Sequence, residues 1–181
     1  MKRSVILGLA LIAGAACGPQ PLTVWKVSLF RGEVPDSCYR NSIPPDEEHQ
    51  TGVQLDLGTW ELYEGPEGKF FLTGVKVNGA ANLPSNQTLE GTFQDDVYTF
   101  DVTDTVIDKR YDGAAVVTVS VQTTIKLTVD GDTFSGTWTQ ADSYGCAGTA
   151  CEANFNLEHP NCTVTHQLKG ARVEAENLHV L

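Results

Sequence analysis

The sequence predicts an all-β fold, an antiparallel up-and-down meander of about 8–10 strands that closes into a barrel or a sandwich. Three observations support this fold class. Apolar and polar residues alternate with a period of two in one segment after another, no segment after residue 20 shows a helical apolar stripe, and a Gly-Thr-aromatic triplet occurs three times. The 181 residues suffice for a single domain with a sizeable core.

The clearest alternation runs from Ala115 to Val129, where every second residue is apolar except Thr123. Its apolar face comprises Ala115, Val117, Val119, Val121, Ile125, Leu127 and Val129. At ~3.3 Å per residue, a straight strand of this length would extend about 50 Å, which is long for a small domain. We therefore expect that the strand either coils strongly around a barrel or breaks near Thr123.

Three tight turns predict how neighbouring strands pair. A two-residue loop at Gly131-Asp132 places Val129, Leu127 and Ile125 opposite Phe134, Gly136 and Trp138, respectively. A loop at Asp95-Asp96 places Phe93, Gly91 and Leu89 opposite Tyr98, Phe100 and Val102. A four-residue loop at 65–68 places Leu62, Trp60 and Gly58 opposite Phe71, Thr73 and Val75. In each register the facing residues are mainly apolar side chains and glycines.

The repeated triplets are Gly58-Thr59-Trp60, Gly91-Thr92-Phe93 and Gly136-Thr137-Trp138. Each puts a glycine and an aromatic side chain on the inner face and a threonine outside. A glycine opposite a bulky residue permits sharp curvature, so the repetition favours closure into a barrel. Leu55 and Leu57 precede Gly58 with one parity and Trp60 follows it with the other, which predicts a β-bulge at Gly58.

Shorter segments complete the meander. Further strands are predicted at Thr23–Arg31, Ala153–Leu157 and Thr163–Lys169, and loops at Gly32–Gln50, Asn78–Gln87, Lys109–Gly113 and Ala141–Cys151. The last residues, Gly170–Leu181, have no assignment. The aromatic residues predicted on the inner face are Trp25, Trp60, Phe93, Phe100, Phe134 and Trp138. Together they are large enough to fill a small barrel.

The N-terminal segment MKRSVILGLALIAGAAC has the three parts of a secretory signal. Lys2 and Arg3 form a positive n-region, an apolar run follows, and small residues lead up to Cys17. The apolar run is shorter than the ~20 residues that span a bilayer. The predicted division of the chain is a signal peptide at 1–16, a tether at 17–21 and one β-barrel-like domain at 22–181.

Two cleavage sites fit this segment. Ala13-Gly14-Ala15 is an A-x-A site, and cleavage there would release a soluble protein. The small residues directly before Cys17, with Gly18 after it, resemble the lipobox of bacterial lipoproteins. This resemblance implies that Cys17 is acylated, becomes the first residue of the exported chain and anchors it to the cell envelope. Because Gly18 stands where an inner-membrane lipoprotein often has Asp, the resemblance implies the outer membrane in an organism that has one.

The chain is acidic, with a net charge of −11 that becomes more negative when Lys2 and Arg3 leave with the signal. Such a surface repels nucleic acid and anionic lipid headgroups. The charge therefore argues against a nucleic-acid partner and favours a membrane attachment through covalent lipid rather than a basic patch. The acidity serves solubility, or else it attracts a basic protein partner.

Five cysteines leave one thiol unpaired in an exported protein, and acylation of Cys17 makes the remaining number even. We predict that the other four form the disulfides Cys146–Cys151 and Cys38–Cys162, which would pin the long loop and the C-terminal hairpin. A metal site is the alternative, but the chain lacks the paired C-x-x-C spacing. We predict no metal and no cofactor.

No catalytic motif stands out, since H-E-x-x-H, G-x-S-x-G and a phosphate-binding glycine loop are all missing from the sequence. His166 shares a face with Val164 and Leu168, which favours a hydrogen-bonded core residue over a general base. Asp130-Gly131-Asp132 is similar to the start of a calcium-binding loop, but the further acidic positions and the terminal Glu of an EF-hand are missing. The predicted hairpin turn accounts for these residues. The acidic residues taken as a solvated face, or else a weak cation site, are Asp95, Asp96, Asp101, Asp104 and Asp108.

The pattern of Gly58-Thr59-Trp60 resembles the Gly-x-Trp of lipocalin-like and avidin-like barrels. This resemblance implies a non-enzymatic module that holds a small apolar ligand inside a barrel. An alternative is an envelope interaction protein whose acidic surface binds a basic partner, as lipid-anchored bacterial lysozyme inhibitors do. An envelope hydrolase with catalytic groups in loops 32–50 or 141–151 is the least favoured reading.

Overall fold

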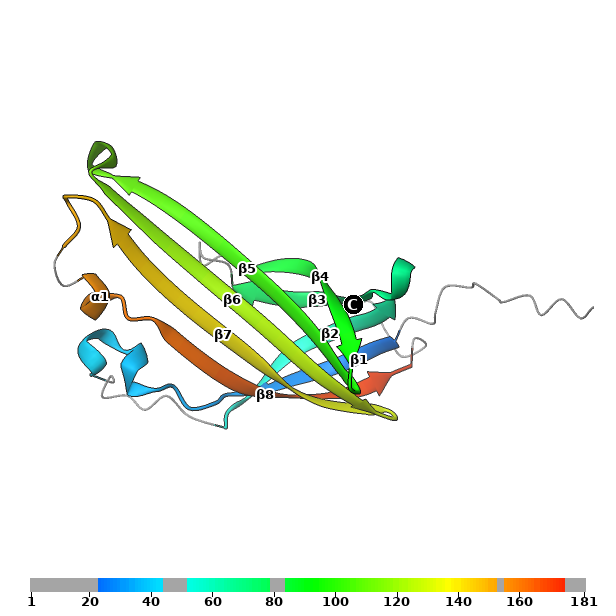
Figure 1. The fold of residues 1–181 in the computed structure, drawn as a ribbon. Helices are drawn as coiled ribbons and strands as arrows, with labels where there is room; N and C mark the ends of the chain where they lie inside the picture. Colours follow the sequence, from blue (N-terminus) through cyan, green and yellow to red (C-terminus); the bar gives the residue numbers. More distant parts are fainter. Residues whose placement is uncertain (1–22, 44–51, 79–83, 153–154, 175–181) are drawn as a thin grey trace, which may run out of the picture.

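The computed structural model describes residues 23–43, 52–78, 84–152 and 155–174, which form a closed antiparallel barrel (Figure 1). The strands are β1 (Thr23–Phe30), β2 (Gln54–Glu64), β3 (Phe70–Asn78), β4 (Pro84–Gln94), β5 (Val97–Arg110), β6 (Ala115–Asp130), β7 (Thr133–Ala147) and β8 (Cys162–Val173). Each strand pairs with the next in chain order, and β1 pairs with β8 to close the barrel. The predicted fold class is confirmed.

Helical turns occupy the connections between strands. They are η1 (Asp36–Cys38), η2 (Arg40–Ser42), η3 (Pro66–Gly68), η4 (Tyr111–Gly113) and α1 (Phe155–Glu158). The strand predicted at Ala153–Leu157 is wrong, because Phe155 begins the single turn of α1. The His159 N–H donates to the Phe155 carbonyl at 2.9 Å, and the two rings lie 4.8 Å apart. This four-residue spacing brings both side chains to one face of the turn, which an extended strand would not do.

The long strand β6 does not break at Thr123. It pairs with β5 and β7 on either side of that residue, and the Thr123 side chain is 1% exposed. Neither alternative is correct in full: β6 runs unbroken, but its first half continues beyond the barrel beside β5 and β7 instead of coiling around it (Figure 1). Part of the loop predicted at Ala141–Cys151 is wrong, because β7 continues to Ala147 along the first half of β6.

Two of the three predicted hairpins have the expected pairing. Across Gly131-Asp132, Val129, Leu127 and Ile125 lie opposite Phe134, Gly136 and Trp138, as predicted. Across Asp95-Asp96, Phe93 lies opposite Tyr98 and Gly91 opposite Phe100. The β4–β5 ladder ends there, so the predicted Leu89–Val102 pair does not form and Leu89 pairs with Leu72 of β3 instead.

The predicted register between β2 and β3 is wrong by one residue. Leu62 lies opposite Leu72, not Phe71, because the loop has five residues and the Gly65 N–H donates to the Lys69 carbonyl at 2.8 Å. Glu67 adopts a left-handed φ of 62° inside this loop. Leu72 therefore points inward, and an irregularity between Leu72 and Val75 brings Val75 to the inner face as well.

The core lies inside the barrel. Its buried residues are Trp25, Val27, Leu29, Trp60, Leu62, Leu72, Val75, Leu89, Phe100, Ile125, Leu127, Phe134, Trp138 and Leu168. Of the predicted inner aromatics, Phe93 is misplaced, because it sits next to the β4–β5 turn and is 44% exposed. There it packs against Tyr98, with ring centroids 4.4 Å apart.

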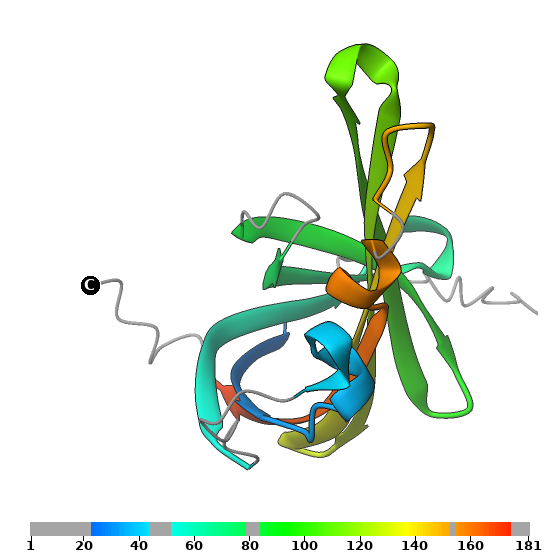
Figure 2. The same ribbon diagram turned by 90° about the vertical axis from the view of Figure 1, so that its left-hand side faces the viewer.

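The strands β5, β6 and β7 continue beyond the barrel as an arm. We define the arm as residues 101–110 of β5, 115–124 of β6 and 139–147 of β7, which pair with one another. Figure 2 shows the β5–β6 hairpin rising away from the barrel, with the end of β7 beside it. The barrel wall and the arm are therefore one continuous sheet.

Candidate ligand-binding site

The barrel wall opens between β2 and β3. These two strands pair only from Glu61 to Glu64 and from Phe70 to Thr73, whereas β2 continues along β1 to Gln54 and β3 continues along β4 to Asn78. The diverging strands leave a cavity of about 350 Å³, which we call the side cleft. The side cleft is lined by Asp56, Leu57, Gly58, Trp60, Lys76 and Trp138.

A β-bulge shapes one rim of the side cleft. Gly58 lies opposite Val27 and Asp56 lies opposite Ser28, so Leu57 is the extra residue of β2, and the bulge predicted at Gly58 is confirmed. Gly58 has a φ of +81°, a conformation that costs glycine little. The bulge ends the regular alternation and brings Leu57 and Gly58 to the edge of the cleft.

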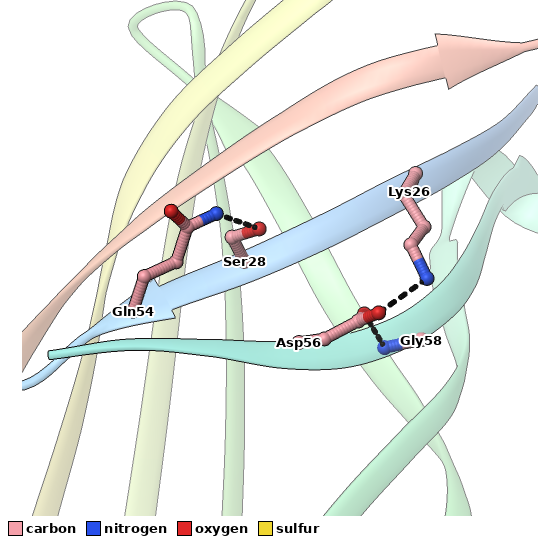
Figure 3. Close-up of polar contacts among 5 residues, drawn as sticks. All are labelled: Lys26, Ser28, Gln54, Asp56 and Gly58. Atoms are coloured by element: carbon pink, nitrogen blue, oxygen red, sulfur yellow. Dashed lines mark hydrogen bonds and ion pairs between the residues drawn. The ribbon is translucent and has the colours of Figure 1, made fainter.

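Polar contacts hold this rim in place (Figure 3). The Asp56 carboxylate accepts a hydrogen bond from the Gly58 N–H at 2.8 Å and pairs with the Lys26 ammonium at 2.6 Å. The Lys26 hydrogen bond, followed by the Gly58 hydrogen bond, lowers the pKa of Asp56. Asp56 is therefore ionised at neutral pH, and the cleft carries this carboxylate together with the ammonium group of Lys76.

Two tryptophans form the apolar part of the side cleft. The rings of Trp60 and Trp138 lie 6.1 Å apart and both side chains are buried. The indole N–H of Trp60, which is 1% exposed, has no hydrogen-bond partner within the described ranges, and the same holds for Trp25. A buried donor without a partner costs roughly 1–3 kcal/mol. Of these two indoles, only that of Trp60 belongs to a residue that lines the cleft.

A second cavity, the mouth pocket, lies where the chain leaves β1. It has a volume of about 280 Å³ and is lined by Arg31, Gly32, Val34, Gln140, Asp142, Cys162, Val164 and His166. His166 lies on the same face as Leu168, as predicted, and its Nδ1 accepts the Gly32 N–H at 3.0 Å. Burial, followed by the charge of Arg31, lowers the pKa of His166. These contacts identify His166 as a hydrogen-bonded structural residue.

The segment from Arg31 to Ile43, which we call the strap, follows β1 and contacts the first half of β8. A Cβ on Gly32 would lie 1.9 Å from the Thr165 carbonyl oxygen, so only glycine allows this close approach to β8. The disulfide Cys38–Cys162 ties the strap to the start of β8, and Arg40 forms an ion pair with Glu158 of α1 at 2.7 Å. Arg31, Gly32 and Val34 of the strap thereby form part of the lining of the mouth pocket.

Both predicted disulfides are present. Cys146–Cys151 closes the turn after β7, and with Cys38–Cys162 it uses the four thiols that the alternative metal site would need. The remaining cysteine, Cys17, lies outside the described residues, as do the predicted signal peptide and tether.

The predicted acidic cluster is spread along β5 rather than gathered. Asp95 and Asp96 form the β4–β5 turn, Asp101 accepts a hydrogen bond from Thr124 at 2.5 Å, and Asp108 pairs with Arg110. Gly131 and Asp132 form the predicted hairpin turn. Within the described ranges no group of three His, Cys, Asp or Glu residues is placed to hold a metal ion.

No protein-family model, curated protein or solved structure matches the chain. The class of protein therefore follows from its own geometry: a closed eight-stranded antiparallel β-barrel with an aromatic core, a side cleft and a disulfide-tied strap. In the described part of the chain, no helix is long and apolar enough to cross a membrane.

Proposed function

We propose that this protein is a lipid-anchored barrel of the cell envelope that binds a small ligand in the side cleft without transforming it. The observation that carries this proposal is the side cleft itself, where Trp60 and Trp138 lie beneath an opening in the barrel wall. Its volume of about 350 Å³ falls within the roughly 300–1,000 Å³ typical of small-molecule sites.

The lining of the cleft favours a ligand with an apolar or aromatic body and a polar end. Leu57, Trp60 and Trp138 line the part of the cleft that would receive the apolar body, and Asp56 and Lys76 offer charges of both signs to the polar end. Binding rather than catalysis is supported by the acid–base properties of the cleft. A general base works best with a pKa near the working pH, whereas the pKa of Asp56 is lowered by Lys26 and Gly58.

The membrane anchor is the second part of the proposal. The signal-like segment before Cys17 and the glycine after it support acylation of that cysteine. The barrel begins at Thr23, so a short tether would hold it close to the membrane surface. The acidic composition of the chain supports attachment by lipid, since anionic headgroups would repel it.

Native mass spectrometry of the protein extracted from membranes tests both parts. We expect an acyl mass on a chain that begins at Cys17, and a small molecule that stays bound without a covalent bond. Leu57→Trp fills the side cleft and should abolish this retention. The matched control is Val129→Trp, because Val129 is also a partly buried residue at the margin of the core but does not line the cleft.

Each part can fail separately. A chain that begins elsewhere or has no acyl mass contradicts the anchor. Absence of a retained molecule from the unmodified protein, or equal retention by Leu57→Trp and Val129→Trp, contradicts ligand binding in the side cleft.

A further inference from the structure

The strand β5 has one uncovered edge. It pairs with β6 from Tyr98 to Arg110, but with β4 only from Val97 to Phe100. From Asp101 to Arg110, no strand in the described part of the chain pairs with its other side. Figures 1 and 2 both show β5 as the outer margin of the arm. This edge presents a row of backbone N–H and C=O groups to solvent, and such a row is a template for pairing with another strand.

The side chains along this edge alternate in a regular way. On the outer face of the arm, Asp101, Thr103, Thr105, Ile107 and Lys109 follow one another and all are exposed. Ile107 is 62% exposed although it is a large apolar residue. The negative charge of Asp101 stands at one end of this row and the positive charge of Lys109 at the other. The row is therefore electrostatically complementary to its own antiparallel copy.

We propose that two copies of the protein associate by antiparallel pairing of their β5 edges, with a two-fold axis through Thr105. A two-fold axis perpendicular to the sheet reverses the strand direction and keeps outer faces on the same side. Asp101 then lies opposite Lys109 of the second copy, and the symmetry produces this pair twice. Thr103 lies opposite Ile107 of the second copy, and the two arms become one continuous sheet.

The charges select this register from its neighbours. Moving the axis by one residue, to Val106, would place Asp104 opposite Asp108 of the second copy and would remove the match between Asp101 and Lys109. Like charges directly opposite each other destabilise a strand pair, whereas opposite charges stabilise it. The axis through Thr105 places opposite charges face to face on the outer side of the sheet.

Cysteine cross-linking in the envelope tests the register directly. Thr105→Cys places a thiol opposite its own copy, within reach of a disulfide. Thr103→Cys is the matched control, because Thr103 lies on the same edge and face and is also exposed, yet its own copy would be about 13 Å away along the strand. We expect a covalent dimer for Thr105→Cys and only monomer for Thr103→Cys on a non-reducing gel.

Three results would overturn the proposal. The first is a Thr105→Cys protein that stays monomeric with a free thiol at that position. The second is equal cross-linking of both variants, which indicates random collision. The third is a disulfide from the Thr105→Cys variant to a different envelope protein without a dimer of this chain, which indicates that another partner covers the edge.

A charge exchange provides the second test. Asp101→Lys or Lys109→Asp alone creates like-charge pairs at both ends of the interface, and we expect each to weaken dimerisation at least about tenfold. The double variant Asp101→Lys with Lys109→Asp should restore it. Lys126→Asp is the matched control for the loss of a lysine, since Lys126 is exposed on β6 away from the edge. Failure of the double variant to restore the dimer contradicts the proposed register.

Discussion

The backbone N–H of Gly32 donates a hydrogen bond to Nδ1 of His166 at 3.0 Å, although the two residues are 134 positions apart. This bond needs Nδ1 without a proton, so it exists only while the imidazole is neutral with its single proton on Nε2. Because Gly32 lies in the strap and His166 lies on β8, the bond holds the strap against β8 beside the mouth pocket, which both residues line.

The stability of the protein should decrease as the pH is lowered through the range where His166 titrates. Burial and Arg31 lower the pKa of His166 in the folded state below the value of about 6.5 in the unfolded chain. The unfolded state then binds more protons, so this contribution to stability is full above about pH 6.5 and is lost as the pH falls through the folded pKa. Urea unfolding between pH 8 and pH 5 measures the slope.

The control for this prediction is His166→Gln, which keeps a hydrogen-bond acceptor near Gly32 but does not titrate. Its free energy of unfolding should depend less on pH in the same range. An identical slope for both proteins would assign the pH dependence to groups other than His166.

The two disulfides should differ in their contribution to stability. Cys38 and Cys162 are separated by 124 positions, whereas Cys146 and Cys151 are separated by five. The chain-entropy relation gives about 5 kcal/mol for the long loop and about 2 kcal/mol for the short one. Paired Cys→Ser variants, compared by urea unfolding, should show the larger loss for Cys38 and Cys162. Equal losses would mean that loop closure does not dominate.

Gly91 should tolerate no side chain. A Cβ at this position would lie 2.4 Å from the ring of Phe100 and 2.4 Å from the Thr99 carbonyl oxygen. Gly91→Ala should therefore lower the free energy of unfolding by about 1–3 kcal/mol, as overpacking does elsewhere. Gly145→Ala is the matched control, because Gly145 is also in a strand and has no atom within 4 Å of its Cβ position. A similar loss for both variants would exclude the contact with Phe100 as the cause.

The features that sequence reasoning predicted correctly depend on local chemistry. The two-residue turn at Gly131-Asp132 fixes the pairing of β6 with β7, because a shift by one residue would turn Phe134 and Trp138 outward. The parity change at Gly58 likewise predicts the bulge. The spacing of Cys146 and Cys151 indicates one disulfide, and Cys38 and Cys162 are then left to form the other.

The features that sequence reasoning missed depend on where the pairing between neighbouring strands begins and ends. The sequence around Gly65 does not reveal whether the loop has four or five residues, because Glu67 takes a left-handed conformation that non-glycine residues seldom adopt. Phe93 and Phe100 have similar sequence contexts, yet only Phe100 lies within the barrel. The side cleft and the β5 edge arise where β2 leaves β3 and β4 leaves β5, and the sequence pattern carries no local signal for either separation.

The most direct test of ligand binding in the side cleft uses the indole N–H signals of the three tryptophans in a ¹H–¹⁵N NMR spectrum. The probe is 1-anilinonaphthalene-8-sulfonate, whose aromatic body matches the two indole rings and whose sulfonate matches Lys76. We predict that titration shifts the signals of Trp60 and Trp138 and leaves that of Trp25, a core residue that does not line the cleft, in place. A shift confined to Trp25, or no shift at all, would contradict ligand binding in the side cleft.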